Sequence, residues 1–184
     1  DVIDEYMEDD FYNFISSPIE DCKLVMSFKT LDMQELKVEE FKKDYPHHME
    51  NLCSIPDVAK YVKNEWKKIT YENGVYLGQI DAEGARTGKG CYIFESGTYM
   101  TGIYVKNTKE GLFKEFTEKH IVTFSGNYLK GKKNGKGKTT FDNGSYYDGE
   151  FKNDVRQGQG EYWFPSGQRY VGNWSEGKKE GNGI

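Results

Sequence analysis

Glycines recur through the C-terminal part of this sequence at a nearly constant interval. Gly78, Gly102, Gly126, Gly149 and Gly172 are separated by 24, 24, 23 and 23 residues. Large side chains stand two residues before and two residues after each of them, at Tyr76, Met100, Phe124, Tyr147 and Tyr170, and at Ile80, Tyr104, Tyr128, Phe151 and Trp174. A fixed period in the range of about 20–50 residues, held at several positions at once, is typical of stacked repeat units. We therefore expect a repeat fold rather than a conventional globule.

Each period contains two alternating stretches that predict a β-hairpin. In residues 144–167, aromatic residues and glycines occupy every second position of 147–151 and again of 158–164, which places them on one face of each strand. Because a single hairpin is only marginally stable in water, the hairpins should stack. The expected fold is mainly β: an elongated ribbon of antiparallel hairpins with an N-terminal, partly helical cap. The expected repeats are 71–96, 97–120, 121–143, 144–166 and 167–184, the last one incomplete.

The connections between hairpins carry a second regular signal. They end in a glycine suited to a positive φ angle, at Asn73-Gly74, Ser96-Gly97, Asn143-Gly144 and Ser166-Gly167. The missing member of this series falls at His120. Histidine tolerates the left-handed region better than most residues, so His120 is interpreted as a substituted turn residue and not as a catalyst.

Most copies open their second strand with Gly-x-Gly. These pairs are Gly88/Gly90, Gly135/Gly137, Gly158/Gly160 and Gly181/Gly183. A glycine beside a large ring leaves a depression that the ring can fill. The second copy has Phe113 where the second glycine should be. We expect that copy to be locally splayed or differently packed.

The N-terminal part differs sharply in composition. None of the 21 glycines lies in residues 1–73, and residues 1–69 carry 16 acidic and 9 basic residues, a net charge of −7. Residues 70–184 carry 14 acidic and 16 basic residues, a net charge of +2. We divide the chain into an acidic tail (1–18), a mostly helical region (19–70) and the repeats (71–184). The tail, with six acids in residues 1–10 followed by an apolar cluster at 11–15, is either simply solvated or docks on a partner or on the repeats.

Within residues 19–70, short patterns predict a strand at Leu24–Phe28 and a helix over Asp32–Tyr45 that Pro46 ends. Pro56 and Asp57 predict the start of a second helix, Asp57–Ile69. We expect the apolar face of this helix to cover the open edge of the first hairpin, since stacked repeats need a terminal cap.

Several chemistries are excluded by missing residues. The stretch Gly131–Thr140 resembles a phosphate-binding loop, but Lys132 stands where that motif needs glycine, so nucleotide binding is not expected. His47-His48 has no further ligand at metal spacing, and we interpret it as a solvated loop. No nucleophile–base set can be assembled. The chain is therefore predicted not to be an enzyme, with no catalytic residues, metal, cofactor or small-molecule substrate.

The cysteines and the chain ends suggest a setting for the protein. The three cysteines show no motif spacing and are interpreted as reduced thiols of a cytosolic protein. No apolar run reaches the ~20 residues that span a bilayer. The sequence begins with Asp1 and stops within its fifth repeat, so we expect the full protein to continue in at least one direction.

A cluster of five lysines is the strongest charge feature of the repeats: Lys130, Lys132, Lys133, Lys136 and Lys138. One interpretation is a basic turn and strand face that keeps the sheet soluble. The other is a contact for an anionic membrane surface or an acidic protein tail. Without interleaved arginines, the cluster does not favour a nucleic-acid partner.

Residues 144–167 resemble a MORN repeat (membrane occupation and recognition nexus). Residues 167–183 and 124–144 do so too, 74–97 match more loosely because of one inserted residue, and the second copy matches only in its first strand. The resemblance implies a hairpin ribbon with an aromatic-lined groove. Members of the family are mostly scaffolds and adaptors, and they are common in cilia, flagella and other cytoskeletal assemblies. In others the repeats lie beside an enzymatic domain, such as a lipid kinase or a lysine methyltransferase.

These observations favour a non-enzymatic interaction scaffold or adaptor in the cytoplasm, in a cytoskeletal, ciliary, flagellar or axonemal assembly. The predicted partner-binding residues are the rings of Tyr104, Tyr128, Tyr147, Phe151, Tyr170 and Trp174, which would receive a segment of a protein partner. The alternative for each ring is that it only fills the core. Two other functions stay open: a peripheral membrane tether that uses the lysine cluster, and a targeting module for an enzyme outside residues 1–184.

Overall fold

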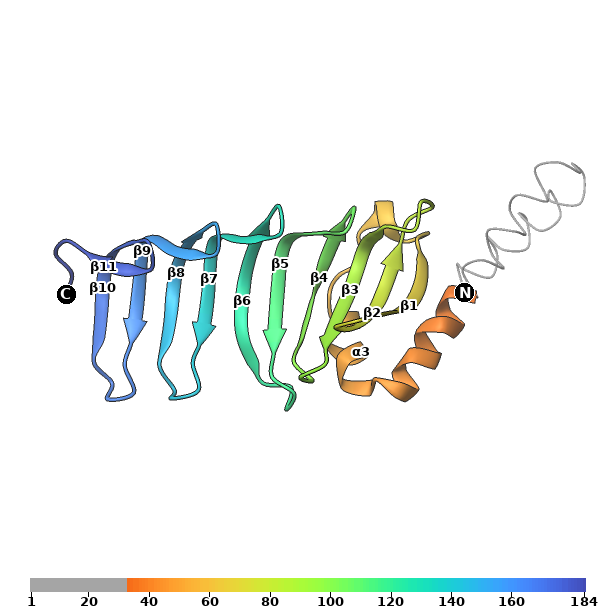
Figure 1. Cartoon of the computed structure of the whole chain (residues 1–184), viewed down its shortest axis with the longest axis horizontal. Coiled ribbons are helices and arrows are strands. Elements are labelled where there is room, and N and C mark those ends of the chain that lie inside the picture. The colour runs from red at the N-terminus through yellow and green to blue at the C-terminus, as the bar shows by residue number, and fades with distance from the viewer. Residues whose placement is uncertain (1–32) are drawn as a thin grey trace, which may run out of the picture.

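The computed structural model describes residues 33–184, which form one long antiparallel sheet of eleven strands (Figure 1). The strand order follows the sequence, so each strand pairs with its predecessor and its successor. The strands are β1 (Glu65–Tyr71), β2 (Gly74–Ile80), β3 (Arg86–Phe94), β4 (Tyr99–Val105), β5 (Thr108–Phe116), β6 (Val122–Leu129), β7 (Lys132–Thr140), β8 (Tyr146–Lys152), β9 (Val155–Trp163), β10 (Arg169–Ser175) and β11 (Lys178–Glu180). The predicted ribbon of hairpins is confirmed.

The recurring glycines form a row across this sheet, because the register places each opposite another. Gly78 pairs with Gly90, and Gly90 with Gly102. Further along, the row continues through Gly126, Gly137, Gly149, Gly160 and Gly172. Phe113 of β5 interrupts it, lying between Gly102 and Gly126.

An aromatic ring lies over the glycines of the regular hairpins. A Cβ atom added to Gly160 would lie 2.4 Å from the Tyr147 ring, and one added to Gly90 would lie 2.5 Å from the Tyr76 ring. The hydroxyl of Tyr147 donates a hydrogen bond to a backbone carbonyl three residues later, at 2.7 Å, and that of Tyr76 does the same at 2.9 Å. Only glycine leaves room for the rings, as the sequence predicted.

The second copy reaches the same packing with a different ring. Met100 replaces the covering aromatic of the other copies, and the fully buried ring of Phe113 lies over Gly102 instead. The β4–β5 pair carries one bulge, as the hairpins on either side do. The copy is therefore differently packed, as expected. Its junction with the next copy, the β5–β6 pair, also carries a register shift between Glu115 and Phe116 that the other junctions between copies lack.

The turn prediction for His120 is confirmed. Its φ angle is 64°, against 84° for Gly97 at the corresponding position one repeat earlier. Gly74 does not follow the expected rule, because it is absent from the positive-φ residues. A Cβ there would lie 2.3 Å from the carbonyl oxygen of Ile93, so close backbone approach, not turn geometry, requires this glycine.

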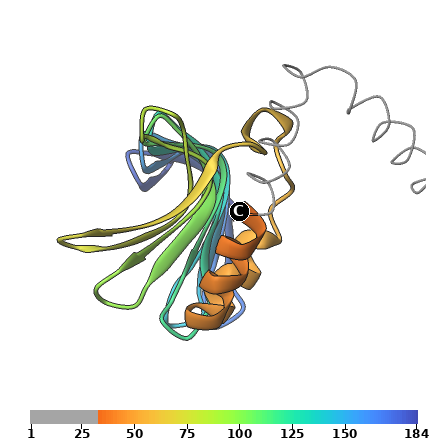
Figure 2. The same ribbon diagram turned by 90° about the vertical axis from the view of Figure 1, so that its right-hand side faces the viewer.

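The N-terminal helices cover the opposite face of the sheet, over β1 to β5 (Figure 2). Residues 33–44 are helical. Pro46 ends that helix and begins the next one, α3 (Pro46–Cys53). Phe41, Met49 and Leu52 are buried there. They pack with a cluster that takes one buried residue from each of the five strands: Trp66, Leu77, Cys91, Tyr99 and Phe116.

The predicted helix Asp57–Ile69 is wrong. Residues Ala59–Tyr61 form one 3₁₀ turn (η1), and Glu65–Tyr71 form β1, paired with β2 along its whole length. Trp66 and Ile69, which a helix over these residues would carry on one face, point to opposite faces of the sheet. Tertiary pairing with the open edge of β2 overrides the local pattern. The cap is supplied by helical residues 33–53 instead. The predicted tail (1–18) and strand (24–28) lie outside the described residues.

The exchange of rings in the second copy predicts a compensating pair of substitutions. Phe113→Gly should destabilise the protein by about 3–5 kcal/mol, the usual cost of removing a buried phenylalanine. Met100→Tyr alone should cost about 1–3 kcal/mol through overpacking against Phe113. Together they restore the arrangement of the regular copies, so the double variant should be more stable than the sum of the two losses predicts. Chemical unfolding followed by circular dichroism measures all four proteins, and strictly additive losses would contradict the exchange.

Candidate functional site

The six predicted partner-binding rings lie on one face of the sheet, called the aromatic face below. Five of them, Tyr104, Tyr128, Tyr147, Phe151 and Trp174, are buried, and Tyr170 is half-buried. They belong to a chain of edge-to-face contacts with centroid separations of 5.2–5.8 Å, which runs through Tyr76, Tyr104, Phe113, Tyr128, Phe124, Phe151, Tyr147, Trp174 and Tyr170. These rings form the core of the ribbon. That they also receive a partner stays a prediction.

A row of cations on the aromatic face was missed by the sequence analysis. Arg86, Lys109, Lys133, Arg156 and Lys179 each stand two residues before a positive-φ glycine, at spacings of 23, 24, 23 and 23 residues. Each lies over at least one aromatic ring. The Cζ atom of Arg86 is 5.2 Å from the Tyr104 ring centroid, and that of Arg156 is 4.5 Å from the Trp174 ring centroid. The sequence did contain the signal, because a basic residue stands two positions before the repeating positive-φ glycine in every copy.

The two arginines are held in aromatic surroundings without a partner carboxylate. Arg86 lies within 5.9 Å of four ring centroids, those of Tyr71, Tyr76, Tyr92 and Tyr104. Its Nη2 donates to the carbonyl of Asn107 at 3.1 Å, and Nη2 of Arg156 donates to that of Gly177 at 2.7 Å. In the described part of the chain neither arginine forms an ion pair.

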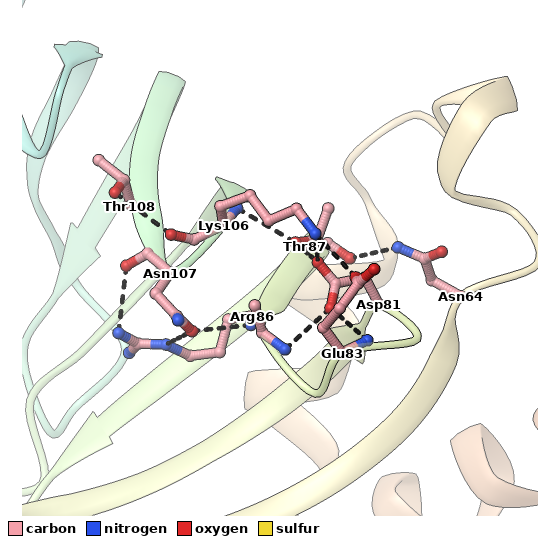
Figure 3. Close-up of polar contacts among 9 residues, drawn as sticks. Asn64, Asp81, Glu83, Arg86, Thr87, Lys106, Asn107 and Thr108 are labelled. Atoms are coloured by element: carbon pink, nitrogen blue, oxygen red, sulfur yellow. Dashed lines mark hydrogen bonds and ion pairs between the residues drawn. The ribbon is translucent and has the colours of Figure 1, made fainter.

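A polar network holds the turn beside Arg86 (Figure 3). Asn107 Oδ1 accepts the backbone N–H of Arg86 at 2.8 Å. On the other side of the turn, the Lys106 ammonium lies 2.7 Å from Asp81 and 2.8 Å from Glu83. The Lys106 ammonium holds the pKa of the Asp81 carboxyl well below its usual range. The loop after β2 and the β4–β5 turn are thereby joined, which fixes the backbone from which Arg86 projects.

In repeats two and three, unlike the repeats of the two arginines, a carboxylate, that of Glu115, lies on the aromatic face. The Tyr128 hydroxyl donates to Glu115 at 2.5 Å, and the Lys133 ammonium lies 3.6 Å from the same carboxylate. Burial, and then this hydrogen bond, raises the pKa of Tyr128. The centre of the face thus holds an internal counter-ion, which the arginines at its two sides lack among the described residues.

The five clustered lysines do not share one surface. Lys133 lies over the Phe124 ring on the aromatic face. Lys138 lies over the Tyr146 ring on the opposite face, where Tyr146 stacks on Trp163. Lys136, which lies opposite Glu150 in the β7–β8 register, shares that opposite face by strand alternation. Lys130 and Lys132 flank the β6–β7 turn.

All three histidines come together, which the sequence analysis did not foresee. His47 and His48 lie in α3 and not in the solvated loop we expected. The ring centroids of His47 and His120 are 4.4 Å apart, and those of His48 and Tyr99 are 4.3 Å apart. Tyr99 also forms a hydrogen bond of 3.0 Å with Nδ1 of His120. Within residues 33–184, no group of three or more His, Cys, Asp or Glu side chains is arranged to hold a metal ion.

This histidine cluster predicts that the protein loses stability in mild acid. Burial, and then the proximity of His120 and His47, lowers the pKa of His48, whose Nδ1 is buried without a hydrogen-bond partner among the described residues. Because the fold favours the neutral imidazole, the contribution is complete above the ordinary histidine pKa of about 6.5 and is lost as the pH falls below it. Thermal unfolding between about pH 7.5 and about pH 5 measures the effect.

The control for this prediction is a side chain that cannot titrate. His48→Phe should flatten the pH dependence while keeping the contact with the Tyr99 ring. His47→Gln, at an exposed position, should keep most of it. A pH dependence that survives His48→Phe unchanged would assign the effect to other groups.

Comparison with known proteins gives a family match in four segments, residues 82–99, 124–146, 147–169 and 170–184, each to the MORN repeat. Residues 100–123, between the first and second matched segments, are unmatched and contain most of the second copy, with Phe113, Glu115 and His120. The matched family is a non-catalytic interaction module, and no enzymatic family is indicated. None of the helices within residues 33–184 is both long enough and apolar enough to cross a membrane.

Curated relatives match the chain over a short part of their length. Alsin of Rattus norvegicus is 34% identical over 84 residues, which are 43% of this chain and 5% of alsin. Alsin of Homo sapiens is 39% identical over 68 residues, 34% of this chain and 4% of alsin. The chain thus spans about 5% of the length of these relatives.

Proposed function

The chain contains MORN repeats, and from that premise we propose that it is a non-enzymatic scaffold that binds a segment of a protein partner along its aromatic face. The observation that carries the proposal is the row of cations over the row of rings. It gives every repeat one positive group above an apolar surface, a combination that suits an amphipathic partner segment.

The accessible part of the aromatic face is its second layer of rings. Tyr71 and Phe164 are 40% and 36% exposed, and Phe94 and Tyr170 are half-buried. We propose that a partner touches these rings and the arginines first, while the buried rings hold them in place. Exposed aromatic anchors supported from below are typical of binding hot spots.

We further propose that the partner belongs to a cytoskeletal, ciliary or flagellar assembly in the cytoplasm, as the family resemblance implies. Imaging of the tagged protein tests this part separately. A protein spread evenly through the cytoplasm would contradict it without touching the binding proposal.

The distribution of the lysines supports a protein partner over a membrane surface. A bilayer presents a broad surface, whereas Lys133 and Lys138 lie on opposite faces of the sheet. Co-sedimentation with anionic vesicles at low salt tests the membrane alternative. Binding that weakens with salt and is lost in a Lys136→Gln/Lys138→Gln variant would favour it.

Two phenylalanines of the aromatic face test the main proposal. Phe94→Ala with Phe164→Ala should weaken partner binding by about tenfold or more, since each anchor is worth more than about 1 kcal/mol. The matched control is Trp163→Ala, which removes the ring next to Phe164 in the sequence, on the opposite face of the sheet. Affinity enrichment with quantitative mass spectrometry compares the variants, after circular dichroism has shown that each is folded. Equal partner recovery by both would sink the proposal.

A further inference from the structure

Two hollows on the aromatic face are built from equivalent residues. One surrounds Arg86 and has a volume of about 550 Å³; the other surrounds Arg156 and has a volume of about 370 Å³. Each arginine is followed by a tyrosine and a phenylalanine at the same spacing, Tyr92 and Phe94 in one case and Tyr162 and Phe164 in the other. The corresponding positions of the two repeats between them hold Glu115 and Thr117, and Thr139 and Phe141. The paired tyrosine and phenylalanine therefore mark the outer hollows alone.

Both hollows are strongly cationic. Each is lined by three basic residues and, among residues 33–184, by no carboxylate: Arg86, Lys109 and Lys130 in the first, and Arg156, Lys178 and Lys179 in the second. A guanidinium carries five N–H donors, and the hydrogen bonds described above occupy only some of them. The remaining N–H donors suit a carboxylate, which arginine can bind through two parallel hydrogen bonds in a bidentate geometry.

The strip between the hollows has a different charge. Glu115 lies there with Lys133, and its carboxylate would repel a second acid. A ligand that fills both hollows should therefore be acidic at its two ends and not in its middle.

The strand spacing sets the distance between the two ends. Arg86 is on β3 and Arg156 on β9, six strand intervals apart, which is about 29 Å at ~4.8 Å per interval. A segment that crosses the strands cannot extend the sheet by backbone pairing, whereas a helix satisfies its own backbone hydrogen bonds and can lie across them. About 19 residues of helix cover that distance.

We propose that the two hollows bind one helix of a protein partner that carries an acidic group at each end, about 19 residues apart. This inference rests on the proposed function and names its ligand. Joining two weak sites by one rigid helix gives an affinity that neither site has alone.

Synthetic helical peptides test the spacing with the full chain. The first is an alanine-rich peptide with two Glu-Glu pairs centred about 19 residues apart. The second has the same composition with the pairs about 10 residues apart, which places one of them near Glu115. Fluorescence anisotropy should show about tenfold or more tighter binding of the first, weakening with added salt. Equal affinity of the two peptides would overturn the inference.

Arginine variants test the sites. Arg86→Gln and Arg156→Gln should each lower the affinity for the first peptide by about tenfold, and the double variant should bind both peptides with equal affinity. Arg→Lys at the same positions keeps the charge and should lose less. The matched control is Arg169→Gln, which removes an arginine that pairs with Glu161 at 2.9 Å on the opposite face. An equal loss in this control would overturn the assignment.

Three further outcomes separate this inference from others. If the double arginine variant keeps the protein partners that Phe94→Ala with Phe164→Ala loses, the scaffold function stands and the paired sites are wrong. If the first peptide does not bind but vesicles containing phosphatidylserine bind and require both arginines, the ligand is a lipid surface. If replacing the six acids of residues 1–10 by Asn and Gln strengthens peptide binding tenfold or more, the chain's own tail occupies the hollows and a separate partner is overturned.

Discussion

The contact between an aromatic ring and a pair of glycines is the interaction on which the rest of this structure depends. On the aromatic face no second layer within residues 33–184 covers the sheet, so each repeat buries its own ring by laying a tyrosine or phenylalanine over backbone that has no side chain. The ring then supports the ring of the next repeat edge to face. Stability accumulates along the ribbon through nearest neighbours, as in other repeat folds. The second copy shows how strict the requirement is, because when Met100 cannot supply the ring, Phe113 does.

The same arrangement creates the aromatic face and its row of cations. Rings packed over glycines present their edges in a line, and the residue two positions before the bulge glycine projects above them. That residue is basic in all five copies, which turns an internal packing motif into a periodic charged surface. Differences between copies then change the charge along this surface. Glu115 offsets the charge of Lys133 at the centre, while among residues 33–184 the arginines of the outer hollows have no carboxylate partner.

The N-terminal region shows why local patterns can fail beside a sheet. Residues 57–69 carry a good helical start, yet 65–71 become a strand because the edge of β2 offers a continuous row of backbone partners. The helical cap came from residues 33–53, whose apolar side chains match five strands at once. The histidine cluster has the same origin. His47 and His48 are far in sequence from His120, and only the docking of α3 on the second copy brings them together.

The sequence by itself determined the ribbon, its repeats, the turn role of His120 and the unusual packing of the second copy. These features follow from short-range periodicity, which two-residue alternation and a constant interval report directly. Only the tertiary structure decided which rings are buried, where the five lysines point and which arginines lack a carboxylate. Those properties depend on contacts between neighbouring repeats and on the faces that the helices leave open. A period fixes which residues are equivalent, but burial and charge pairing depend on what lies across from each of them.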